Sequence, residues 1–115
     1  MTKSDDLTRF KHIQQAAKEA ISFVEGRSRK DLDKERMLSL ALVRLIEIIG
    51  EAANNISSQK QEQYSEIPWR RIIGMRNRLI YAYFEVDLEI VWQVVTKDLP
   101  TILPQIEAAI SKLKD

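Results

Sequence analysis

The sequence predicts an all-α fold, a single-domain bundle of four to five helices. Apolar residues recur at helical spacing along most of its 115 residues. Only three glycines and three prolines interrupt it, too few for the many turns of an all-β sandwich. Apolar residues make up 44% and charged residues 30%, which is typical of a folded domain with its own core. We therefore expect residues 1–115 to form one domain.

The first helix is predicted over residues 7–24, where apolar side chains follow steps of three and four and share one face. Gly26 suits the end of this helix. Residues 26–34 are polar and charged, so we expect a loop there. Asp31 or Asp33 is a candidate cap for the helix that follows.

The second helix, over residues 37–56, is apolar nearly all round, since thirteen of its twenty residues are apolar. Such a helix is buried on several faces. The simplest explanation is the core on one side and a second copy of the chain on the other, which predicts a homodimer. The polar exceptions form one narrow stripe, which is either a solvated face with helix salt bridges or the wall of a polar cleft or interface. They are Arg44, Glu47, Glu51 and Asn54.

The remaining chain is predicted to form further helices. Pro68 suits the first turn of the third helix. An aromatic stretch over residues 81–86 then interrupts the helical pattern, and Asp87 is a candidate cap for the fourth helix. Residues 98–100 indicate a joint before the last helix, which begins near residue 101 or is kinked at Pro104.

Composition also excludes several kinds of site and location. Without cysteine, the chain has no disulfide, zinc ribbon or thiol nucleophile, and it suits a reducing cytosol. A single histidine excludes a multi-histidine metal site within one chain, so we expect no metal and no cofactor. No stretch resembles a secretory signal or a membrane span. We therefore expect a cytoplasmic protein that does not bind membranes.

Four arginines lie within residues 70–78 of a chain whose formal net charge is only +1. Guanidinium groups bind phosphate through paired hydrogen bonds, and aromatic rings such as those that follow stack on bases. The segment is therefore a candidate RNA-binding surface. The alternative is that these arginines are solvated or paired with acidic residues, and that the aromatic rings belong to the core.

This segment resembles the HepT-like family of HEPN-domain proteins, whose signature is Arg, four residues, His, one residue, Tyr. Arg76 matches the arginine, Asn77 the polar residue that follows it, and Tyr83 the final tyrosine. The resemblance extends over nearly the whole chain through further ordered matches. These are residues 49–52, 67–69, 86–87, Trp92 and residues 98–100.

The resemblance implies a toxin of a toxin–antitoxin system, a small helical endoribonuclease that dimerises so that two motifs face one cleft. It implies RNA cleavage without a metal, and an antitoxin of nucleotidyltransferase fold that adds AMP to the motif tyrosine, here Tyr83. Arg76 and position 81 would be catalytic. The residues expected to support them or bind RNA are Asn77, Arg78, Arg44, Glu47 and Glu51.

The sequence departs from the family where the motif histidine should stand, because position 81 is Tyr81. Cleavage by the RNA's own 2′-hydroxyl needs a proton acceptor near neutral pH. Histidine, with an ordinary pKa of about 6.5, is suited to this, whereas tyrosine, at about 10, is not. We expect a weak or inactive nuclease that folds, dimerises and binds RNA. The substitution is either natural or an acquired or engineered inactivation.

Geometry adds two expectations. Arg76 and position 81 lie about 140° apart on an unbroken helix, so the helix must unwind near Tyr81 or a second subunit must complete the site. The one histidine, His12, lies off the apolar stripe of the first helix, and we interpret it as solvated or at an interface. The alternative function is a non-catalytic helical module that dimerises or binds nucleotide as the partner of a nucleotidyltransferase.

Overall fold

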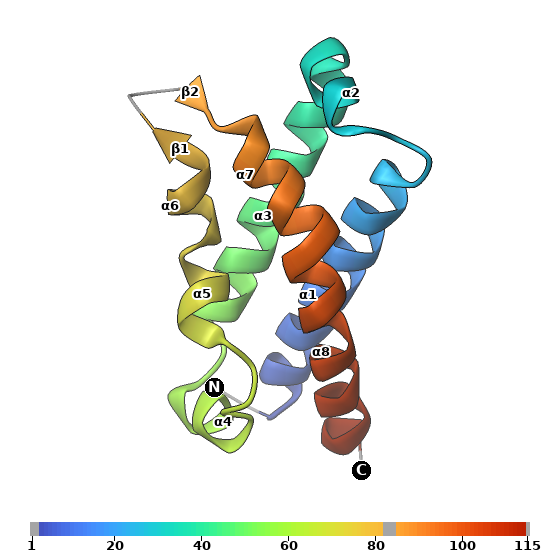
Figure 1. Cartoon of the computed structure of the whole chain (residues 1–115). Coiled ribbons are helices and arrows are strands. Elements are labelled where there is room, and N and C mark those ends of the chain that lie inside the picture. The colour runs from blue at the N-terminus through green and yellow to red at the C-terminus, as the bar shows by residue number, and fades with distance from the viewer. Residues whose placement is uncertain (1–2, 82–84, 115) are drawn as a thin grey trace.

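The computed structural model describes residues 3–81 and 85–114 and is an all-α bundle with one short pair of strands (Figure 1). This confirms the predicted fold class. In chain order the elements are α1 (Lys3–Val24), α2 (Arg29–Lys34), α3 (Arg36–Asn54), α4 (Ser58–Gln63), α5 (Trp69–Ile73), α6 (Met75–Leu79), β1 (Ile80–Tyr81), β2 (Glu85–Val86), α7 (Leu88–Gln93), η1 (Val94–Asp98) and α8 (Leu99–Lys114).

Three long helical segments build the bundle. α1 packs against both α3 and α8, while α5 and α6 pack on α3 (Figure 1). α3 is thus the central helix, and it holds the segment that carries the four arginines. The first helix ends as predicted, because α1 stops at Val24 and Gly26 adopts a positive φ of 73°.

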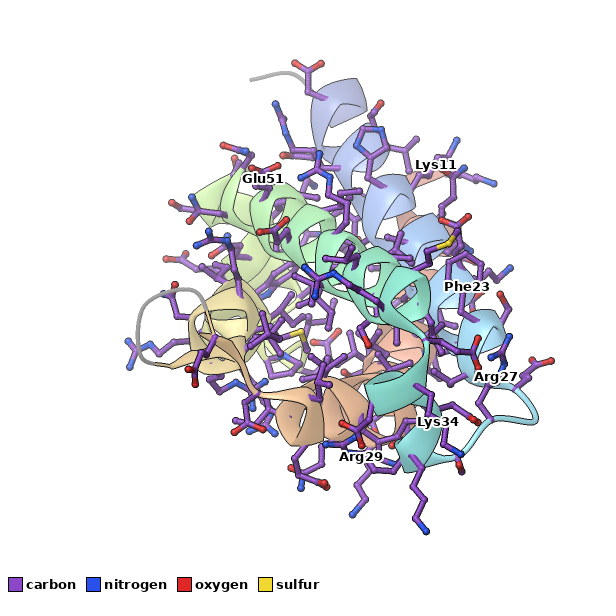
Figure 2. The ribbon with its side chains drawn as sticks, turned by 90° about the horizontal axis from the view of Figure 1, so that it is seen from above. Lys11, Phe23, Arg27, Arg29, Lys34 and Glu51 are labelled. Carbon is purple, nitrogen blue, oxygen red and sulfur yellow. The ribbon has the colours of Figure 1, made fainter. Side chains whose placement is uncertain are left out.

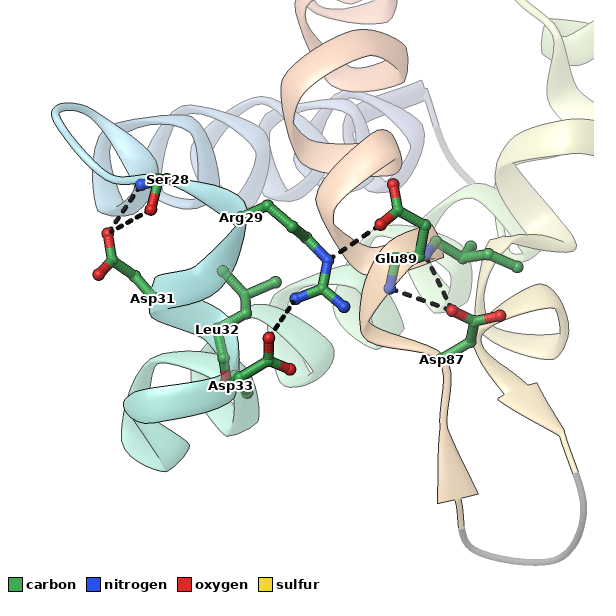
Figure 3. A network of polar contacts seen from close by, with 9 residues as sticks. Ser28, Arg29, Asp31, Leu32, Asp33, Asp87 and Glu89 are labelled. Atoms are coloured by element: carbon green, nitrogen blue, oxygen red, sulfur yellow. Dashed lines mark hydrogen bonds and ion pairs between the residues drawn. The ribbon is translucent and has the colours of Figure 1, made fainter.

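The predicted loop over residues 26–34 is wrong from Arg29 onward, where α2 forms. Ser28 is the N-cap of α2, and the Asp31 carboxylate accepts hydrogen bonds from the Ser28 backbone N–H at 2.7 Å and hydroxyl at 3.4 Å (Figure 3). Neither Asp31 nor Asp33 caps α3, whose N-cap is Glu35. The start of α2 is therefore set by a capping box, and the polar composition of the segment had led to the prediction of a loop.

α2 packs on α7, and Arg29 adds a polar link between them. Arg29 donates hydrogen bonds to Asp33 on its own helix and to Glu89 on α7, both at 3.1 Å (Figure 3). The predicted cap of α7 is confirmed, since the Asp87 carboxylate accepts from the N–H groups of Glu89 at 3.0 Å and Ile90 at 3.3 Å.

The predicted joint at residues 98–100 is wrong, because η1 runs directly into α8. Pro100 has no N–H, and in a regular α-helix its ring would press on the carbonyl four residues earlier. The chain accommodates this by widening one turn into a π-helix, in which the Leu99 N–H donates to the Val94 carbonyl. Pro104 lies inside α8, which begins two residues before the predicted start.

The helix predicted from Pro68 divides into α5 and α6 at Gly74. An aromatic cluster holds its start, because the Phe10 ring meets those of Tyr64 and Trp69 edge to face at 5.8 and 5.6 Å between centroids. The Trp69 Nε1–H donates to the Tyr64 carbonyl at 3.1 Å. These contacts bind α5 to α1 and fix where the arginines begin.

α3 and α5 approach each other closely at Gly50. A Cβ at this position would lie 3.5 Å from the Ile73 carbonyl oxygen and 3.6 Å from that of Ile72, so the contact has room for a methyl group and little more. This contact sets the distance between α3 and the α5–α6 segment. Polar side chains on α3 can therefore reach those on α6.

Candidate functional site

Arg76 lies on α6 and is held by a carboxylate from α3. Its Nε donates to Glu47 Oε2 at 3.0 Å, and Arg44 Nη1 lies 3.7 Å from the other oxygen of the same carboxylate. Glu47 is half-buried, whereas 53% of the Arg76 side chain remains exposed. The carboxylate thus fixes the direction of a guanidinium that is still open to a ligand.

Glu51 lies one helical turn beyond Glu47 and faces a different set of residues. It lines a hollow of about 250 Å³ between α1 and α3 together with Arg9, His12 and Asn55. His12 is exposed, as expected for a solvated histidine. Within residues 3–81 and 85–114, Glu51 makes no ion pair with Arg76.

Arg78 points away from Arg76 and belongs to a separate network. Arg71 Nη2 lies 3.1 Å from both carboxylate oxygens of Asp98 in η1, and Arg78 Nη2 donates to the same carboxylate at 3.3 Å. This network ties α5 and α6 to η1. Arg71 and Arg78 are therefore paired with an acidic residue, which is the alternative to an RNA-binding role. Asp98 was not predicted as a partner, because no local sequence signal links it to Arg78, which lies twenty residues earlier in the chain.

Asn77 and Arg70 share a second hollow on α5 and α6. Both are exposed and line it with residues of α4 and α5. Of the four arginines, three therefore have carboxylate partners. Arg70 has none within the part of the chain that the structure describes.

The helix ends before position 81. α6 stops at Leu79, and the backbone of β1 pairs antiparallel with β2, with Ile80 opposite Val86 and Tyr81 opposite Glu85. One of the two ways for Arg76 and position 81 to share a cleft, the unwinding of the helix before Tyr81, is therefore present. The structure describes Tyr81 by its backbone, and Tyr83 lies outside the described residues.

The described residues contain neither a cluster suited to a metal ion nor a helix suited to a membrane. Among them, no group of three or more His, Cys, Asp or Glu side chains is placed to hold a metal ion. None of the helices that the structure describes is long and apolar enough to cross a membrane.

Comparison with known proteins identifies the family. A family model described as "Ribonuclease HepT-like" matches residues 13–109. "Putative RNase TTE0752" of Caldanaerobacter subterraneus subsp. tengcongensis is 39% identical, over 90% of this chain and 92% of that protein. "Probable ribonuclease HepT" of Thermococcus cleftensis is 38% identical, over 77% of this chain and 84% of that protein.

A third relative, "Putative RNase MJ1380" of Methanocaldococcus jannaschii, is 32% identical over 93% of this chain and 98% of its own length. No solved structure matches the chain at a significant level. The family model covers most of the bundle, including α3, α6 and the strand with position 81. The chain belongs to the HepT-like ribonuclease family.

Proposed function

We propose that the chain is the toxin of a HEPN/nucleotidyltransferase toxin–antitoxin system, a cytoplasmic endoribonuclease that acts without a metal. In this reaction the RNA 2′-hydroxyl oxygen attacks the adjacent phosphorus as it loses its proton. The bond from phosphorus to the leaving oxygen breaks, and that oxygen gains a proton. Arg76 binds the phosphate and stabilises its developing negative charge, while position 81 serves the proton transfers. Tyr81 serves them poorly compared with the family's histidine, so we expect the chain itself to cleave RNA weakly or not at all.

The observation that carries this proposal is the placement of Arg76. Glu47 orients its guanidinium, 53% of the Arg76 side chain is exposed, and α6 ends between Arg76 and position 81. A fixed, exposed guanidinium beside a strand suits the binding of a scissile phosphate. RNA cleavage and growth arrest by a Tyr81→His variant test the proposal, and a variant that does neither would contradict it.

A second copy of the chain is the proposed partner for the outward face of α3. Figure 2 shows α3 crossing the middle of this face, with Glu51 near one end and α2 at the other. Met37 and Leu40 on α3 are 86% and 54% exposed, which is unusual for large apolar side chains. Covering them with a second α3 would bring the two Arg44–Glu47–Arg76 groups to one interface.

Leu40→Glu is expected to weaken this dimer at least a hundredfold. A buried leucine contributes about 1.5–3 kcal/mol, and a two-fold interface loses it twice. Analytical ultracentrifugation over a range of concentrations measures the change. Phe23→Glu is the matched control, because Phe23 is also exposed but lies on α1 instead of α3 (Figure 2). Equal weakening by both variants, or none by Leu40→Glu, would contradict the α3 interface.

The proposed antitoxin is a protein of nucleotidyltransferase fold that adds AMP to Tyr83. The support is the motif itself, in which Tyr83 follows Arg76 at the family's spacing. Mass spectrometry of the chain produced together with its nucleotidyltransferase partner is expected to find AMP on Tyr83. A Tyr83→Phe chain should carry none at this position, and modification confined to another residue would contradict the assignment.

The alternative function is a non-catalytic helical module that dimerises or binds nucleotide as a partner of the nucleotidyltransferase. Tyr81 favours it, because a tyrosine is a poor proton acceptor near neutral pH. This alternative predicts that the Tyr81→His chain binds a nucleotide but neither cleaves RNA nor arrests growth.

A further inference from the structure

Arg70 differs from the three arginines that follow it. Arg71 and Arg78 share the carboxylate of Asp98, and Arg76 pairs with Glu47. The guanidinium of Arg70 is exposed and makes no ion pair or hydrogen bond with any residue that the structure describes. An unpaired guanidinium keeps its charge and all its donors for a ligand.

The hollow that Arg70 lines has an unusual charge. Its volume is about 530 Å³, and its lining holds one guanidinium and two amides but no carboxylate: Gln61, Trp69, Arg70, Ile73, Gly74 and Asn77. The hollow between α1 and α3 contains two carboxylates and one arginine, and so does the one beside β2. The hollow that Arg70 lines therefore favours an anionic ligand more than these two hollows do.

The position of this hollow relates it to Arg76. Arg70, Gly74 and Asn77 follow helical spacing along α5 and α6, and Asn77 is the residue after Arg76. Seven residues of helix place Arg70 about 10 Å from Asn77 along the axis. Gly74, which has no side chain, lines the hollow with its backbone, and a Cβ there would lie a close 3.2 Å from the Arg70 carbonyl oxygen. The hollow therefore begins at Asn77, next to Arg76, and extends along α6 and α5 away from Arg76.

Gln61 gives the hollow a fixed acceptor. Its Nε2 donates to the carbonyl oxygens of Ala53 at 3.0 Å and Ile56 at 3.2 Å, which orients the amide. Within the described residues its Oε1 accepts no hydrogen bond, so it can accept one from a ribose hydroxyl. An adjoining hollow shares Gln61 and Arg70 with it and adds Glu62 and Arg71 to the lining.

We propose that this hollow binds the nucleotide next to the scissile phosphate of single-stranded RNA. Arg70 binds its backbone phosphate, while Gln61 and Asn77 contact its ribose and base. The inference rests on the ribonuclease function proposed above. It adds a binding residue outside the motif and a direction for the RNA strand, from Arg76 along α6 and α5 toward α4.

Fluorescence anisotropy with a short, end-labelled single-stranded RNA tests the binding step. The chain with Tyr81 is suitable because little cleavage is expected during the measurement. Arg70→Gln is expected to weaken binding roughly tenfold. It should also reduce the slope of log K against log salt by about 0.7, the loss of one phosphate contact. Arg70→Lys should retain the slope, as should Lys30→Gln on α2, at the other end of the molecule (Figure 1).

Cleavage kinetics in the Tyr81→His background separate this inference from the function on which it rests. Arg70→Gln is expected to raise KM with little change in kcat, because the contact is made equally in the ground and transition states. If Tyr81→His cleaves RNA and Arg70→Gln changes neither KM nor the salt slope, the subsite is overturned and the function stands. If Tyr81→His neither binds nor cleaves RNA, both are overturned.

Discussion

Replacing Tyr81 by histidine is expected to raise the rate of RNA cleavage by roughly 10²–10⁴, the usual contribution of a positioned acid–base group. Tyrosine stays protonated near neutral pH, so it is a poor acceptor for the proton of the attacking 2′-hydroxyl. Imidazole can accept that proton and return it to the leaving oxygen. Single-turnover cleavage of a labelled RNA measures the gain, and arrest of growth on expression should accompany it.

The pH profile and a matched variant identify the source of this gain. Histidine is neutral above about pH 6.5, so the advantage of the Tyr81→His chain should shrink as the pH falls below that value. Tyr81→Phe removes the hydroxyl without adding an acceptor and should stay at the level of the original chain. If Tyr81→Phe shows the same gain in rate as Tyr81→His, or if the gain is independent of pH, position 81 does not act through proton transfer.

Removing Arg76 in the active Tyr81→His background is expected to lower kcat by roughly 10²–10³, the scale for losing one donor that stabilises transition-state charge. The fold should tolerate the change. The Arg76–Glu47 pair is more than half exposed on the arginine side, so its loss should cost no more than about 1 kcal/mol of unfolding free energy. Arg76→Ala should therefore separate activity from stability.

Two variants show whether Arg76 acts through its own guanidinium. Arg76→Lys keeps the charge but not the planar pair of donors, so activity should recover only in part. Arg44→Ala removes the other arginine on Glu47 and should have a much smaller effect, because Arg44 is 64% exposed and lies 3.7 Å from the carboxylate. An equal loss from Arg44→Ala, or a large fall in the melting temperature of Arg76→Ala, would contradict the assignment.

Local sequence signals predicted those parts of the fold that local interactions determine. The spacing of apolar residues gave α1 and α3, and Asp87 marked the start of α7. α2 was missed because its capping box lies in a polar segment with no apolar periodicity. The joint predicted at residues 98–100 does not exist, because tertiary packing keeps the chain helical and a widened turn accommodates Pro100.

The candidate site was predictable in part for the same reason. Spacing placed Glu47 on the polar stripe of α3, and the structure brings it to Arg76 through the close contact of α3 and α5. The separation of Arg78 from Arg76 was not predictable, because it depends on Asp98 twenty residues later in the chain. Arg70 has no carboxylate partner among the described residues, and this too was not predictable, because it depends on where the carboxylates lie in the folded chain.

The packing of α1 against both α3 and α8 has a consequence for synthesis on the ribosome. Buried side chains of α8, such as Ile102 and Ile106, fill the core beside α1, so α1 cannot complete its packing until α8 has been synthesised. Domains generally fold as units, and the apolar face of α1 cannot be fully covered before α8 is released. A nascent chain whose residues 99–114 are still inside the ribosome therefore cannot complete the bundle or its core.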